Sequence, residues 1–92
     1  MHPIGKQALA GRIEEGRVIL SCRRGTADDL TFYARRESET DFIPLDDDGE
    51  CVVDDRPKLD PGRPEVRRYF AMLLYGGEET RLKSNEVELT VP

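Results

Sequence analysis

The sequence is poor in the residues that build catalytic and metal sites. Among its 92 residues it has one histidine, His2, and two cysteines, Cys22 and Cys51. A catalytic nucleophile needs a base on a neighbouring rigid element, and the predicted strands supply no histidine for a Cys–His or Ser–His–Asp set. The cysteines lie far apart with no histidine nearby, which does not fit a zinc site, and no glycine-rich phosphate loop is present. We therefore expect no enzymatic activity and no cofactor.

Long apolar runs and clustered positive charge are also missing. No stretch reaches the roughly 18 apolar residues of a membrane span, and residues 1–16 lack the apolar core of a signal peptide. The net charge is −5, and residues 39–60 alone hold nine acidic against two basic side chains. Nucleic-acid phosphates would be repelled from that segment. We expect neither membrane insertion nor nucleic-acid binding, and the composition leaves the compartment open.

Two cysteines are too few for a disulfide framework, so we interpret them as free thiols. Free cysteine is among the most buried residue types, and Cys22 is in phase with the apolar residues Val18 and Leu20. Both Cys22 and Cys51 are therefore predicted to be small core residues.

From residue 17 onward, apolar side chains recur at every second position, which is the period of a β-strand. Strands are predicted at 17–23, 30–37, 65–75 and 85–91. Two more are predicted on either side of Asp48-Gly49, a dipeptide typical of a tight hairpin. Pro44 cannot donate a ladder hydrogen bond, so its strand is expected at a sheet edge. Six or seven short strands separated by turns predict an antiparallel β-sandwich.

The alternation also predicts which residues form the core. Those expected to be almost fully buried are Leu20, Cys22, Phe32, Leu59, Ala71, Val87 and Leu89. Strand 65–75 is apolar on both faces from Tyr69 onward, which favours a central position.

Residues 1–16 are predicted to form an N-terminal arm ahead of a sandwich domain at 17–92. Ala8, Leu9 and Ile13 have spacings that fit one face of a helix. Gly11 weakens such a helix by about 1 kcal/mol. The arm is therefore expected to be a short helical segment or an irregular one.

The stretch LDPGRPEVRRYFA, followed by LYGGEETRLKSNEVELTV, resembles the end of a fibronectin type III domain. The matching positions are Leu59, Pro61, Gly62, Ala71, Gly76, Ser84 and Val87. Two positions differ, because Cys22 stands where that family usually has tryptophan and Glu65 where it has the corner tyrosine. The resemblance implies an immunoglobulin-like sandwich of about seven strands, in which the penultimate strand lies beside the third and the last. The ending is also similar to a C-terminal sandwich module of bacterial proteins.

The segment DDDGECVVDD gathers carboxylates that are hard oxygen ligands of the kind calcium prefers. The weak candidates for such a site are Asp46, Asp48 and Glu50. Consecutive strand residues point to opposite faces, however, and the spacing is not that of an EF-hand loop. We therefore predict a solvated acidic hairpin with no metal, and keep a calcium site as the alternative.

The resemblance implies a second feature, an apolar patch outside the sandwich interior. If Tyr69, Ala71 and Leu73 point inward, the alternating residues of the same strand point outward. The predicted interaction patch is Tyr33, Phe70, Met72 and Leu74. Apolar patches of a few hundred Å² usually mark interaction sites. Either the N-terminal arm, through Leu9 and Ile13, or a partner chain is expected to cover it.

The function expected from the sequence is a non-catalytic protein-interaction or spacer module of a larger bacterial protein or assembly. Its partner is expected to be another protein or a second copy of the chain in a homodimer. A calcium-dependent or carbohydrate-binding accessory module is the alternative.

Overall fold

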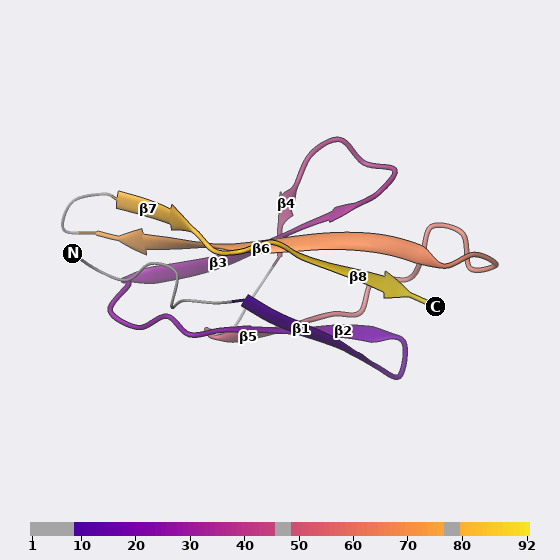
Figure 1. Cartoon of the computed structure of the whole chain (residues 1–92), viewed down its shortest axis with the longest axis horizontal. Helices are drawn as coiled ribbons and strands as arrows, with labels where there is room; N and C mark the ends of the chain where they lie inside the picture. The colour runs from indigo at the N-terminus through magenta and orange to yellow at the C-terminus, as the bar shows by residue number, and fades with distance from the viewer. Residues whose placement is uncertain (1–8, 46–48, 77–79) are drawn as a thin grey trace.

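The computed structural model of the chain describes residues 9–45, 49–76 and 80–92. Within these ranges the protein has eight strands and no helix. The strands are β1 (Leu9–Glu14), β2 (Arg17–Cys22), β3 (Asp29–Arg36), β4 (Ile43–Pro44), β5 (Cys51–Asp54), β6 (Glu65–Tyr75), β7 (Thr80–Lys83) and β8 (Val87–Val91). They form two antiparallel sheets of three and five strands, which lie as two layers in Figure 1. The predicted all-β fold of two antiparallel sheets is confirmed.

Strand β6 organises the larger sheet. The smaller sheet has the order β1-β2-β5, and the larger one runs β4-β3-β6, with β7 and β8 both on the far side of β6. β7 pairs with the second half of β6 and β8 with its first half. The structure has two strands, β1 and β7, that the alternation did not predict, where about seven strands were expected. β6 is the longest strand and a central one, as its two apolar faces indicated.

The core lies between the sheets and follows the predicted alternation. Residues from β2, β3 and β6 point inward and are almost completely buried: Val18, Leu20, Cys22, Leu30, Phe32, Ala34, Tyr69, Ala71 and Leu73. From β8, Val87 and Leu89 pack against this core but are only partly buried, so the prediction that they are almost fully buried is wrong. Two other residues that were predicted to be buried are exposed. Leu59 is 63% exposed because it lies on a surface corner, and Cys51 is exposed because it is in phase with Val53 on the outward face of β5, opposite the buried Val52.

The helix expected near the N-terminus is wrong for residues 9–14, which form strand β1 along β2. Leu9 and Ile13 point into the core side of the sheet, and Gly11 lies between them on the same face. A Cβ at Gly11 would come within 3.0 Å of side-chain atoms of Leu20 and Leu89. Glycine at this position therefore lets β1 approach β8 closely. Because Gly11 has no side chain, the alternation of apolar residues that is typical of a strand could not be recognised in residues 9–13 of the sequence.

The hairpin predicted around Asp48-Gly49 is wrong. β4 pairs with β3 in one sheet, whereas β5 pairs with β2 in the other, so the chain crosses between the layers. Gly49 does have the positive φ, 103°, that the turn signal implied. A local turn preference determines that the chain changes direction, but it does not determine which strand the following residues pair with. Pro44 lies on an edge strand, as predicted.

The side chain of Asn85 forms two hydrogen bonds with the backbone of Leu9, as a neighbouring strand would. Leu9 donates its backbone N–H to Asn85 Oδ1 at 2.8 Å, and Asn85 Nδ2 donates to the Leu9 carbonyl at 3.1 Å. These two bonds satisfy backbone groups at the start of β1, which otherwise ends the smaller sheet.

Candidate functional site

The outer face of the five-stranded sheet carries the predicted patch. Tyr33 on β3 lies directly opposite Phe70 on β6, and their rings stack with centroids 5.0 Å apart and planes at 11°. Met72 and Leu74 follow Phe70 on the same side of β6, opposite Thr31 and Asp29 of β3. Phe70 is buried, and Tyr33, Met72 and Leu74 are half-buried. The structure thus brings together the four residues chosen from the sequence.

The cover over Phe70 comes from an unexpected part of the chain. Phe42, just before β4, places its ring edge on Phe70 with centroids 4.8 Å apart, and Lys83 Nζ lies 4.6 Å from the Phe70 centroid. The proposed cover by the N-terminal arm is wrong for residues 9–14, because Leu9 and Ile13 belong to the opposite sheet and face the core. Phe42 is in phase with Pro44, which pairs with Tyr33, and this alternation was the available signal for it.

A cluster of buried charges, which sequence reasoning missed, lies inside one end of the sandwich. Its members come from β3, β5 and β6 and from the segment after β5: Arg36, Asp54, Arg56, Glu65, Arg67 and Tyr69. Arg67 is 0% exposed and Asp54 2% exposed. Arg67 donates to Asp54 Oδ2 at 3.3 Å and to Glu65 Oε2 at 2.5 Å. Because Asp54 belongs to one sheet and Arg67 to the other, the cluster ties the layers together.

The carboxylates of this cluster are held ionised. Burial alone would raise the pKa of Asp54, but hydrogen bonds from Arg56 and Tyr69 outweigh it, and the pKa is lowered. Burial likewise opposes ionisation of Glu65, but the backbone N–H of Leu59 and the guanidinium of Arg67 lower its pKa. The pKa of Tyr69 is raised by burial and by its hydrogen bond to Asp54 at 2.8 Å. These groups are therefore charged, or neutral in the case of tyrosine, at neutral pH.

A positional signal for the cluster existed in the sequence. Arg67 and Glu65 are in phase with Tyr69 and Ala71, and Asp54 is in phase with Val52, so alternation alone directs them inward. Charged residues are almost never buried unless they are paired, which is why composition argued against that placement. The pairing is visible only once β5 and β6 face each other.

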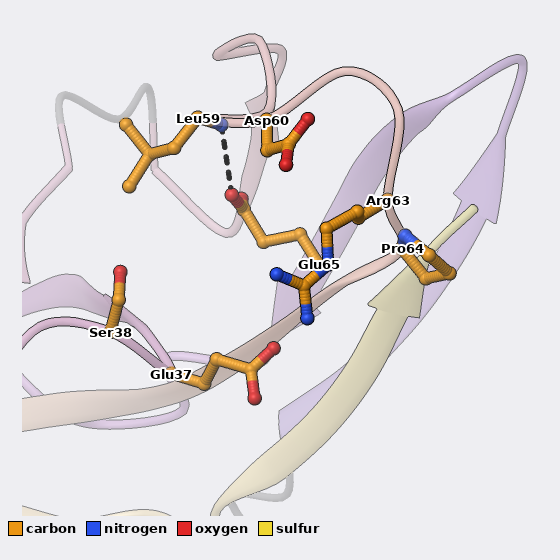
Figure 2. Close-up of a pocket in the computed structure, with 7 residues that line it drawn as sticks. All are labelled: Glu37, Ser38, Leu59, Asp60, Arg63, Pro64 and Glu65. Carbon is orange, nitrogen blue, oxygen red and sulfur yellow. Dashed lines mark hydrogen bonds between the residues drawn. The ribbon is translucent and has the colours of Figure 1, made fainter.

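Glu65 also builds the corner that precedes β6. Its Oε1 accepts the backbone N–H of Leu59 at 3.0 Å, while its Oε2 accepts from Arg36 and Arg67. A pocket of about 450 Å³ opens beside it. The pocket is lined by Glu37, Ser38, Leu59, Asp60, Arg63, Pro64 and Glu65. Figure 2 shows Glu65 reaching from β6 to the Leu59 backbone, with Glu37 and Ser38 on the other side.

The carboxylates of the pocket are largely occupied by the chain itself. Asp60 accepts from the Gly62 N–H at 3.0 Å, Glu65 serves the corner and the buried cluster, and Glu37 accepts weakly from the Val66 N–H at 3.4 Å. Each of these three carboxylates therefore already accepts a hydrogen bond from the backbone around the corner.

Of the weak calcium candidates, Asp46 and Asp48 lie outside the described residues. Glu50 is exposed, and its carboxylate accepts the backbone N–H of Arg24 at 2.7 Å. Across the described ranges, no three His, Cys, Asp or Glu side chains are grouped so that they could hold a metal ion. In the same ranges the chain has no helix that could cross a membrane.

Comparison of the chain with protein-family models, curated proteins and solved structures finds no match.

Proposed function

We propose that the protein is a non-catalytic protein-interaction or spacer module with a fibronectin type III-like fold, part of a larger bacterial protein or assembly. The position of β6 between β3 on one side and β7 and β8 on the other supports the fold type, because it is the neighbourhood that the resemblance implies. The carboxylate of Glu65 also acts where the family's corner tyrosine would, since it binds the backbone of Leu59 six residues upstream.

The observation that carries the proposal is the outer face of the five-stranded sheet. Around the buried ring of Phe70, the side chains of Tyr33, Met72 and Leu74 remain half-exposed and lie next to one another on β3 and β6. A contiguous apolar surface on a sheet suits a partner protein, because each Å² of apolar area that the partner removes from water stabilises the complex by about 25 cal/mol.

The use of the titratable groups supports a non-catalytic role. The buried charges are consumed in contacts between the two sheets, and within the described residues every buried side-chain nitrogen and oxygen has a hydrogen-bond partner. A catalytic acid or base needs a protonation state that changes near neutral pH. Asp54 and Glu65 instead have lowered pKa values, and their carboxylates are already shared among arginines and backbone groups. The calcium- or carbohydrate-binding alternative gains no support from the described residues.

Site-specific photo-cross-linking in the full-length protein, expressed in its own host, tests the proposal. A cross-linking residue at position 72 lies on the proposed surface, and one at position 53 is the matched control. Val53 is 45% exposed and lies on the outer face of the smaller sheet. We expect position 72 to give one discrete cross-linked protein and position 53 to give none. The proposal fails if position 72 gives no discrete product, or if both positions give the same one.

A further inference from the structure

Among the described residues, the charges on the outer face of the five-stranded sheet balance, although the chain carries a net charge of −5. The described charged side chains that alternation places on this face are four acids and four bases: Asp29, Glu37, Glu86 and Glu88 against Arg35, Arg68, Arg81 and Lys83. Two copies of an acidic protein repel each other over most approaches. This face is one on which they can meet without that repulsion.

The charges are also ordered about β6. In one row across the sheet, Leu74 has Asp29 on the β3 side and Arg81 on the β7 side. In a second row, Arg68 has Arg35 on the β3 side and Glu88 on the β8 side. In both rows the residues that flank β6 have opposite charges, and the sign reverses from one row to the other.

This order makes the face complementary to itself. A two-fold axis that runs along β6 in the plane of the interface places β3 of one copy over β7 and β8 of the other. Asp29 then meets Arg81 of the second copy, and Arg35 meets Glu88 of the second copy. Phe70 is already covered by Phe42 and Lys83 of its own chain, so Met72 and Leu74 are the apolar residues of β6 that lie on the axis and cover each other. Arg68 also lies on the axis and forms an ion pair with Glu88 of its own copy at 3.0 Å, so each Glu88 faces both this Arg68 and Arg35 of the second copy.

We propose that the partner of this surface is a second copy of the chain, bound face to face about a two-fold axis along β6. The inference rests on the proposed function, because it takes the same outer face as the binding surface. Sheets that pack face to face keep their strands within about 30° of each other, so matched rows stay close. The complementary charges fix the register of the dimer, and the apolar centre supplies most of its burial.

Charge-reversal variants studied by sedimentation equilibrium test the arrangement. Asp29→Arg alone and Arg81→Asp alone each place like charges at two equivalent contacts. We expect each to raise the dimer dissociation constant by about 10-fold, because a weak exposed ion pair is reversed at two equivalent contacts. Both sites are exposed, so circular dichroism should show each variant folded like the wild type. Arg12→Asp makes the same charge change on the smaller sheet and is expected to leave dimerisation unchanged.

Mixing the two variants gives the sharpest result. A copy with Asp29→Arg and a copy with Arg81→Asp are complementary at both contacts, so the mixture should dimerise about as well as the wild type, although neither variant does so alone. A mixture that remains monomeric would overturn the proposed axis. So would dimers that are insensitive to both substitutions.

The dimer and the broader interaction surface fail in different ways. If the wild type stays monomeric at every concentration, and NMR signals of β3 and β6 do not shift on dilution, the homodimer is wrong. A discrete cross-link from position 72 to a different protein would then leave the proposed function standing with another partner. A cross-linked product of two copies of the chain supports both.

Discussion

Replacement of Arg67 by methionine should remove much of the stability of the fold. Arg67 is completely buried, and its guanidinium serves Asp54, Glu65 and the carbonyl of Arg56. Methionine fills a similar volume but donates no hydrogen bond, so two buried carboxylates lose a positive partner. Breaking a buried ion pair from one side costs about 3–5 kcal/mol. That is a large part of the roughly 5–15 kcal/mol by which a small domain is stable.

The neighbouring arginine supplies the matched control. Arg68 is exposed on the other face of β6, where it forms an ion pair with Glu88. Arg68→Met makes the same substitution at a solvent-exposed position, and it should lower the free energy of unfolding by about 1 kcal/mol or less. Urea unfolding followed by far-ultraviolet circular dichroism measures both variants. With a slope of about 1.5 kcal/mol per M, the midpoint should fall by about 2–3 M for Arg67→Met.

An equal, small midpoint shift for the two variants would refute the reasoning. It would mean that the sheets are held together by apolar packing alone and that the buried charges contribute no net attraction. Stabilisation by Arg67→Met would refute it more strongly, because desolvation of the charges would then outweigh their mutual attraction.

Three other predictions concern the buried carboxylates, the two cysteines and Leu59. Asp54 and Glu65 have pKa values lowered from their ordinary 3.8 and 4.5, so their stabilisation is complete above those values. This stabilisation is lost as the pH falls through the lower folded-state pKa values. In Asp54→Asn the free energy of unfolding should therefore depend less steeply on pH in the acid range. An unchanged dependence on pH would contradict this. Cys51 is exposed, whereas burial and the charge of Glu50 raise the pKa of the Cys22 thiol. One thiol should therefore react with a thiol reagent in the native protein and the second only after denaturation, and two fast reactions would disprove this. Leu59→Ala should change stability by less than about 0.5 kcal/mol in a thermal melt, because that side chain is 63% exposed; a larger loss would show that the corner needs it.

The sequence determined the strands β2, β3, β6 and β8 and their faces, but it did not reveal β1 or β7. Alternation along β2, β3, β6 and β8 correctly predicted which side chains point inward, because the period of two is a property of the extended backbone itself. It also singled out β6 as central from its two apolar faces. Alternation placed Phe70, Met72 and Leu74 on one face of β6, and the fibronectin type III resemblance, which implies that the third strand lies beside it, added Tyr33 to that face.

Only the tertiary structure decided the partners of those faces. Asp54 meets Arg67 13 positions later, Arg36 meets Glu65 29 positions later, and Asn85 returns 76 positions to Leu9. The Asp48-Gly49 turn signal was compatible with a hairpin as well as with a crossing between sheets, and only the pairing of β5 with β2 distinguishes them. Local sequence fixes which way a side chain points. What it meets depends on strand order, which is set by the joint burial of distant segments and leaves little trace in any one of them.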